Sequence, residues 1–289
     1  MTHAHRSSPA ATRRLVAPLA AACLGALLAA TAARAQVLAM VNPTQASITV
    51  IGDEPAVREL VVSNLGAAPV RVRVRLSDWS LSERGEIGLE PLGSNQRSLK
   101  GALSVTPVEQ TIAAGASGRI EVRVALDSKG PPTRWGIVLS EVRSLFAPAG
   151  VPGSPAATEL GTTVLVSRVP ADQVHAELVG LTARALGRDS IAITARVHNT
   201  GLRYFVMTGS AALTDSAGAR LGGGPMEPGL VLPGAVRSFE WSGHVARGHD
   251  ACIASATFDS GEPELLMGET RFRWPARFTP VADAGRGPR

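Results

Sequence analysis

Hydrophobic and polar residues alternate along much of the chain after residue 36. The clearest run is 70–76, VRVRVRL, in which four aliphatic side chains alternate with three arginines. Successive side chains of a strand point to opposite faces, so this period predicts a strand with one buried and one solvated face. The pattern returns at 120–126 and 190–197. Helical periodicity is nearly absent, and the sequence therefore predicts a protein built of strands.

Turn signals interrupt these runs at short intervals. They contain Gly, Pro, Asn or Asp and lie at 52–53, 64–66, 84–85, 114–115, 199–201, 233–234 and 260–261. Many short strands separated by such turns favour an all-β sandwich over an α/β fold. The run 222–224, GGG, which Pro225 follows, lacks the Lys-Ser/Thr of a phosphate-binding loop. We expect it to form a hairpin loop.

One order of signals occurs twice along the chain. The segment 62–66, VSNLG, leads into an alternating strand, and 197–201, VHNTG, leads into a second strand-like run. Further on, a glycine turn at 112–115 precedes a strand, and its counterpart at 232–234 precedes another. An order that repeats at similar spacing indicates two similar domains. We expect two immunoglobulin-like β-sandwiches in tandem.

The domain boundaries depend on the strands that each sandwich needs. The segment 147–160 is rich in Pro, Gly and Ala, which is typical of an exposed loop. The run after it, 162–169, has the composition of a strand that would complete the first sandwich. We therefore place the first domain at 36–170, with the loop inside it, and the second at 171–279. A disordered tail is expected at 280–289.

Residues 1–35 have the composition of an export signal. Arginines precede an acid-free apolar run, 15–33, which ends in the triplet ARA before Gln36. A basic segment, an apolar segment and such a triplet predict a signal peptide that is cleaved before Gln36. Cys23 offers the alternative of a lipid-modified cysteine. The choice between general and twin-arginine export stays open.

Removing that segment changes the charge argument. The chain carries 29 Lys and Arg against 24 Asp and Glu, but 1–35 holds four arginines and no acid, which leaves 25 against 24. A balance near zero gives no reason to expect nucleic acid as a partner. Cys252 is the one cysteine beyond the signal, so we expect no intrachain disulfide. No later apolar run reaches the ~18 residues of a membrane helix.

The sequence carries no catalytic signature, and we expect neither an enzyme nor a cofactor. Gly-x-Ser-x-Gly and His-Glu-x-x-His motifs are both absent. Four potential metal ligands lie close together in sequence: His244, His249, Asp250 and Cys252. Their spacing fits no familiar ligand set, and 251–258 has the pattern of a strand with Cys252 as a small core residue. We therefore expect no metal site.

Arginines form a polar stripe on one strand face, made of Arg71, Arg73 and Arg75. The stripe is a candidate surface for an acidic partner, extended by Arg119 and Arg123. The alternative that we favour is a solvated face neutralised by acids such as Glu121. Tryptophans are expected in the core or between sheets rather than on a ligand platform. They are Trp79, Trp135, Trp241 and Trp274.

A series of short motifs between residues 36 and 170 follows a recognisable order. These are NPT at 42–44, LVVSN at 60–64, PVRV at 69–72, DW at 78–79, LSVTP at 103–107, RIEV at 119–122 and the runs 135–142 and 164–169. In this order the segment resembles the N-terminal domain of periplasmic pilus-assembly chaperones, the PapD-like family. The last two runs then take the places of the F and G strands. The second domain resembles only generic Ig-like domains.

The resemblance implies a periplasmic protein that presents a strand to a pilin-like or other surface subunit. In the family, the G strand of the first domain completes the open sandwich of a subunit by strand addition. The corresponding donor residues are Thr163, Val164, Leu165, Val166, Ser167 and Arg168. The alternative is a structural or adhesive module of the cell envelope, with Ig-like domains as spacers and no chaperone activity.

Two positions depart from the family. Its members hold the subunit's C-terminal carboxylate with an Arg on the first strand and a Lys at the start of the G strand. Here the first strand, 44–50, reads TQASITV, and the G strand begins with GTT at 161–163. Neither segment contains a basic residue, so the family's carboxylate site is not carried over to this chain.

Overall fold

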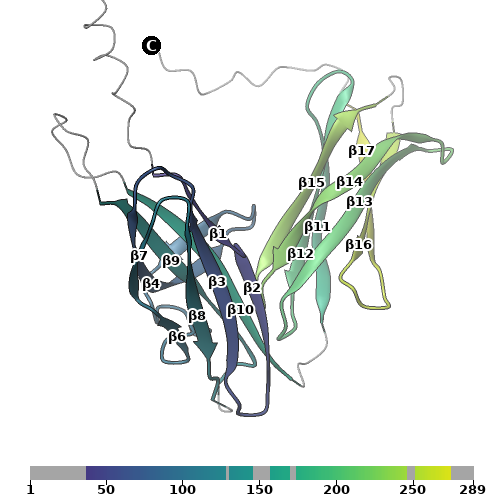
Figure 1. Ribbon diagram of the computed structural model, residues 1–289. Coiled ribbons are helices and arrows are strands. Elements are labelled where there is room, and N and C mark those ends of the chain that lie inside the picture. The colour runs from purple at the N-terminus through teal and green to yellow at the C-terminus, as the bar shows by residue number, and fades with distance from the viewer. Residues whose placement is uncertain (1–36, 128–129, 146–156, 170–173, 246–250, 275–289) are drawn as a thin grey trace, which may run out of the picture.

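The computed structural model describes residues 37–127, 130–145, 157–169, 174–245 and 251–274. None of these residues forms a helix long and apolar enough to cross a membrane. Their strands, in chain order, are β1 (Ala39–Asn42), β2 (Gln45–Ile51), β3 (Ala56–Asn64), β4 (Val70–Leu81), β5 (Ile87–Glu90), β6 (Leu103–Thr106), β7 (Glu109–Ile112), β8 (Ser117–Val124), β9 (Thr133–Ser144), β10 (Ala157–Val169), β11 (Ala176–Ala185), β12 (Ser190–Asn199), β13 (Phe205–Asp215), β14 (Arg220–Val231), β15 (Val236–His244), β16 (Ala251–Asp259) and β17 (Leu266–Arg273). Figure 1 shows that they form two sandwiches, so the predicted fold class is confirmed.

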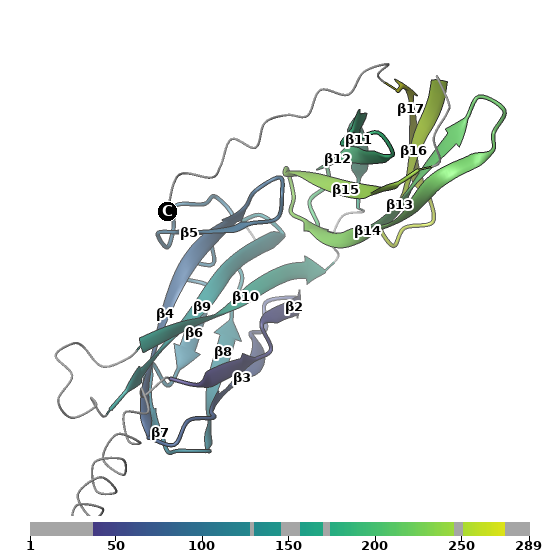
Figure 2. The same cartoon turned by 90° about the horizontal axis from the view of Figure 1, so that it is seen from above.

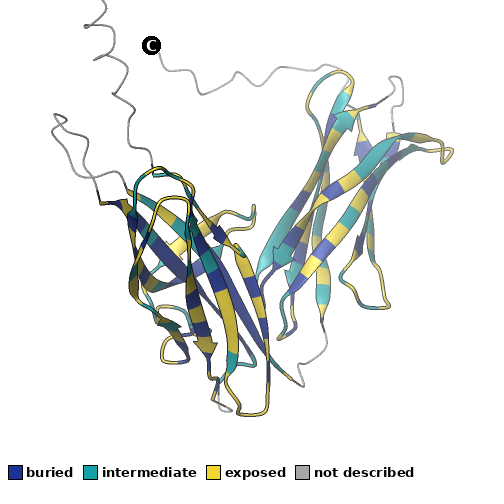
Figure 3. Ribbon diagram, viewed as in Figure 1, coloured by how far each residue is buried: buried dark blue, intermediate teal, exposed yellow. Residues whose placement is uncertain are grey.

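The first sandwich consists of two sheets. One has the strand order β1-β3-β8-β6, and the other has the order β2-β10-β9-β4-β5, with β7 also pairing with β4. On β4, Val70, Val72 and Val74 are buried, while the arginines between them are exposed. Leu60 and Ile120 of the facing sheet belong to the same core. Figure 3 shows this alternation as buried and exposed bands along the strands.

The second sandwich has one sheet of order β11-β12-β15 and one of order β14-β13-β16-β17. Ile193 and Met207 are fully buried in its core, where the rings of Phe239 and Phe258 lie 5.3 Å apart. Cys252 is buried in the same core on β16. The prediction that this cysteine is a small core residue is therefore confirmed.

The repeated Asn-x-Gly motif has the same structure in both sandwiches. The buried Asn64 side chain donates Nδ2 to the carbonyls of Ala68 at 2.8 Å and Ala113 at 3.0 Å, and its Oδ1 accepts from Gly66 N. In the second sandwich, Asn199 Nδ2 donates to Arg203 O at 2.9 Å and Val231 O at 3.1 Å. Each amide therefore fastens its own turn to the neighbouring glycine turn.

Two loop predictions need correction. The loop expected at 147–160 extends too far, because residues 157–160 already pair with β9. The run 222–224 is part of β14 and pairs with β13, so it is not a hairpin loop. A Cβ on Gly224 would lie 2.9 Å from Trp241 Nε1, so the glycines make room for an indole. Glycine marks close packing as well as turns, and the sequence does not separate the two.

Other predictions fall outside the described residues. They concern the signal peptide at 1–35 with its alternative at Cys23, the remaining loop residues 147–156, the domain boundary near 170–172 and the tail at 280–289. These stay predictions. His249 and Asp250, two of the four potential metal ligands, also lie outside the described ranges.

Candidate functional site

The strand predicted to meet a partner, β10, has two unlike halves. It pairs antiparallel with β9 from Ala157, opposite Arg143, to Ser167, opposite Thr133. On its other edge, β2 runs parallel to it only from Thr163 onward. Figure 2 shows β2 alongside the arrowhead end of β10 alone. Among the described residues, no strand pairs with the second edge of 157–162.

All six predicted donor residues lie in the half that is paired on both edges. Thr163, Val164, Leu165, Val166 and Ser167 have partners on β2 and on β9. Arg168 pairs with Val50 of β2 and donates its backbone N–H to Pro132 O at 2.8 Å. A strand bonded along both edges has no backbone group left for a partner. Strand addition through these six residues would require β2 to leave.

The half with the unpaired edge carries one large apolar side chain. Leu160 packs against the first core, and Thr158 lies on the same face of the strand. On the opposite face, the Glu159 carboxylate accepts two hydrogen bonds from Arg75 Nη2, at 2.8 and 3.0 Å. Gly161 leaves room for Ile137, whose Cδ1 would lie 3.0 Å from a Cβ at that position. This edge therefore offers mainly backbone groups.

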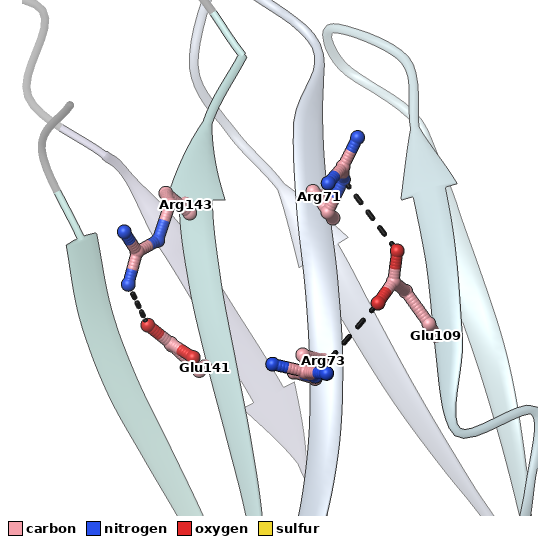
Figure 4. Close-up of a pocket in the computed structure, with 5 residues that line it drawn as sticks. All are labelled: Arg71, Arg73, Glu109, Glu141 and Arg143. Atoms are coloured by element: carbon pink, nitrogen blue, oxygen red, sulfur yellow. Dashed lines mark hydrogen bonds and ion pairs between the residues drawn. The ribbon is translucent and has the colours of Figure 1, made fainter.

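A charged cluster lies on the same sheet, on β4, β7 and β9 (Figure 4). Glu109 lies 3.6 Å from Arg71 Nε and 3.8 Å from Arg73 Nε. Arg143 donates a hydrogen bond to Glu141, which is the main reason why the pKa of Glu141 is below its ordinary value. The β4 arginines are thus neutralised within their own face, as expected for the solvated alternative, but by Glu109 and Glu159. Glu121, the acid named from the sequence, lies on β8 of the opposite sheet.

The arginine stripe does not extend as the sequence suggested. Arg119 and Arg123 lie on β8, in the sheet opposite the β4 arginines. Arg119 pairs with Glu59 of the neighbouring β3 at 3.0 Å. The two sets of arginines therefore face away from each other, and the extended surface for an acidic partner is wrong.

An apolar cluster joins the two sandwiches. Trp79, Trp135 and Leu165 of the first sandwich pack with Leu232 of the second, and all four are buried. Trp79 Nε1 donates to Gly136 O at 2.9 Å, and Trp135 Nε1 donates to Trp79 O at 3.0 Å. Both indoles are thus satisfied. They were expected in the core or between sheets, and the structure places them between the domains.

The turn between β4 and β5 bonds directly to the second sandwich. Glu83 O accepts from Ser238 N at 2.7 Å and from Arg237 Nη1 at 2.9 Å, and its carboxylate accepts from Arg196. The hydrogen bond from Arg196 lowers the pKa of Glu83 and raises the pKa of Arg196. Figure 2 shows β5 reaching toward β14 and β15. No sequence pattern marks these contacts.

Neither protein-family models nor curated proteins match the chain. Solved structures do. The chain is similar to the YadV chaperone at 13% identity, over 81% of this chain and 99% of that chain, with a TM-score of 0.45. The CupB2 chaperone of Pseudomonas aeruginosa is 12% identical, over 80% of this chain and 98% of that chain, with a TM-score of 0.41. A structure of the Salmonella enterica SafA pilin in complex with the SafB chaperone is also similar. It shows 13% identity over 80% of this chain and 96% of that chain, with a TM-score of 0.40.

The remaining candidate was a metal site around His244. Within the described part of the chain, no group of three or more His, Cys, Asp or Glu side chains is placed to hold a metal ion. His244 Nδ1 lies 3.9 Å from Oδ1 of Asp189, the residue that precedes β12. Burial raises the pKa of the Cys252 thiol, which keeps it in the neutral form that suits a core.

Proposed function

We propose that this chain is a periplasmic, non-enzymatic chaperone that offers the unpaired half of β10 to a pilin-like or other surface subunit. One observation carries the proposal. Residues 157–162 are held by β9 on one edge, and no described strand pairs with the other edge. An added strand bonds to such an edge through backbone groups, with little dependence on its sequence.

The doubly paired half of β10 supports this role by holding the unpaired half in place. Val164, Leu165 and Val166 are fully buried, and Thr162 Oγ1 donates to Pro43 O at 2.8 Å. An edge that is already ordered loses little conformational entropy when a partner binds, and this favours association. We therefore assign Thr163–Arg168 to anchoring and residues 157–162 to contact with the subunit.

The composition of the unpaired edge also supports the role. Natural edge strands are commonly protected by proline, lysine or a bulge. Residues 157–162 read ATELGT and contain neither Pro nor Lys, and their pairing with β9 has no register shift. Glu159 supplies a charge, but its carboxylate is bound to Arg75 on the sheet face. A spacer module would gain nothing from leaving this edge open.

The direction of the backbone groups allows a sharp test. Thr163 N donates to Thr44 O at 3.0 Å, toward the β2 side. Because N–H groups alternate in direction along a strand, Glu159 N–H points to the same side, where the edge is unpaired. Glu159→Pro therefore removes a donor from the open edge without removing a bond to β9. Glu159→Gln removes the same charge and keeps the N–H.

The experiment is co-expression of the chain with pilin-like subunits, followed by affinity purification from the periplasm. We expect the wild type and Glu159→Gln to retain a subunit and Glu159→Pro to lose it, with unchanged thermal unfolding of the chaperone. Retention by Glu159→Pro, or a wild type that retains no subunit, would contradict the proposal. A chain that stays with the envelope during fractionation would favour the structural or adhesive alternative.

A further inference from the structure

The strand β17 forms one end of the four-stranded sheet in the second sandwich. It pairs with β16 along its whole length, from Leu266 opposite Phe258 to Arg273 opposite Ala251. β11 of the other sheet contacts β17 but does not pair with it. Among the described residues, no strand bonds to the outer edge of β17. Figures 1 and 2 both place this strand away from β10, so its edge is distinct from the one proposed to meet a subunit.

This edge lacks the usual protection against a second strand. Prolines, lysines and bulges commonly blunt exposed edges. Two other edge strands of the same sandwich have them, because β14 contains Pro225 and Pro228, and the pairing of β11 with β12 has a register shift after Leu178. β17 reads LMGETRFR, contains neither Pro nor Lys, and pairs with β16 without a shift. A regular strand of this kind can pair along its outer edge.

Two opposite charges lie next to each other on the outward face of β17. Glu269 and Arg271 are two positions apart, so their side chains share one face, and both are exposed, whereas Phe272 on the other face is buried. Their cross-strand neighbours on β16, Ser255 and Ile253, carry no charge. Neither charged residue forms an ion pair with another described residue. The edge therefore presents one acid and one base to an incoming strand.

We infer that two copies of this chain associate edge to edge through β17, antiparallel and about a two-fold axis at Thr270. Glu269 of each copy then lies directly opposite Arg271 of the other, because each is one residue from the axis. The two-fold symmetry forms this pair twice. Opposite charges in directly opposing positions stabilise an antiparallel strand pair, and like charges weaken it. Backbone bonds between the two edges join the two sheets into one.

The charges select this register. An axis at Glu269 would place the two copies of that carboxylate opposite each other, and an axis at Arg271 would do the same with the two guanidinium groups. With the axis at Thr270, no like charges on this face are opposed. Met267, which is 66% exposed, then lies opposite Arg273 of the second copy, whose aliphatic stem can cover it.

Sedimentation velocity of the full chain over a wide range of concentrations tests the inference. The wild type should pass from monomer to dimer as the concentration rises. Glu269→Arg places arginine opposite arginine in both pairs, and Arg271→Glu places glutamate opposite glutamate, so each variant alone should dimerise at least about tenfold more weakly. An equal mixture of the two variants should associate as tightly as the wild type, because each supplies the charge that the other lacks.

The strand β8 offers a matched control. Glu121 and Arg123 have the same spacing and are both exposed, but β8 pairs with β3 on one edge and with β6 on the other. Glu121→Arg and Arg123→Glu should therefore leave dimerisation unchanged. Glu159→Pro should also leave it unchanged, which separates the β17 edge from the β10 edge. Thermal unfolding of each variant establishes that it is folded.

A wild type that stays monomeric at its highest soluble concentration would overturn the inference. So would a dimer that survives both charge reversals, or a mixture of the two folded variants that associates no better than either alone. A dimer that only Glu159→Pro abolishes would place the contact on β10 and would overturn the inference as well. Dimerisation and retention of a subunit are measured separately, so the β10 proposal can fail while this one stands.

Discussion

Glu83 of the first sandwich receives two hydrogen bonds from the guanidinium of Arg196 on β12 of the second, at 2.7 and 3.1 Å. The two residues are 113 positions apart in sequence. The backbone N–H of Ser238 and the side-chain Nη1 of Arg237 both donate to the carbonyl of Glu83 beside this pair. Together with the apolar cluster around Trp79, these contacts hold the two sandwiches against each other.

Glu83→Gln should increase motion between the sandwiches while both remain folded. The substitution removes the ion pair with Arg196 but leaves the backbone bonds of residue 83 in place. Small-angle scattering should report a broader distribution of interatomic distances, and each sandwich should keep its unfolding transition. Arg119→Gln breaks an exposed pair within the first sandwich and serves as the control. An equal effect of both variants would contradict a specific role for Glu83.

The same pair predicts a dependence of domain motion on pH. The hydrogen bond from Arg196 lowers the pKa of Glu83 below its ordinary value of 4.5. Because the pKa of Glu83 is lowered in the folded state, the pair stabilises the domain contact fully at pH values above the ordinary pKa. This stabilisation is lost as the pH falls through the lowered pKa. Scattering profiles should therefore broaden on acidification below about 4.5. The Glu83→Gln variant should not show the part of this change that the pair causes.

Leu165→Ala should destabilise the folded chain. Leu165 is fully buried at the domain junction, and replacing a buried leucine by alanine costs about 2–5 kcal/mol of unfolding free energy. Thr158→Ala, on the half of β10 with the open edge, should stay within about 0.5 kcal/mol of the wild type. Denaturant unfolding measures both changes. If Leu165→Ala proved neutral, the assignment of this half of β10 to anchoring would be untenable.

Asn64→Ala and Asn199→Ala should each weaken their own sandwich. Each amide donates to a carbonyl of its own turn and to one at or next to the neighbouring glycine turn, and its loss leaves these acceptors without that bond. An unsatisfied buried group costs about 1–3 kcal/mol. Hydrogen exchange should rise around the altered turn and not around its counterpart. Ser63→Ala, which removes a bond to Ser117 at the surface, is the matched control with a small expected effect.

The alternation of residues determined the strands and their buried faces. With a period of two, only one orientation of β4 buries its apolar side chains, with Val72 facing the core and Arg73 facing the solvent. This orientation does not depend on which strands lie beside β4. The two Asn-x-Gly segments likewise predicted two similar units, because an asparagine that bonds its own turn is a local device. These features depend on near neighbours in the chain and are therefore readable from it.

The tertiary structure decided which groups are left without a partner. Whether an edge of β10 is open depends on where β2 begins, at Gln45 opposite Thr163, and the alternation of Thr163–Arg168 carries no information on that. The bond from Arg196 to Glu83 likewise depends on a contact between segments far apart in sequence. The pairing of strand edges and of charges depends on residues far apart in the chain, so only the folded chain shows which edges and charged groups of the described residues are paired.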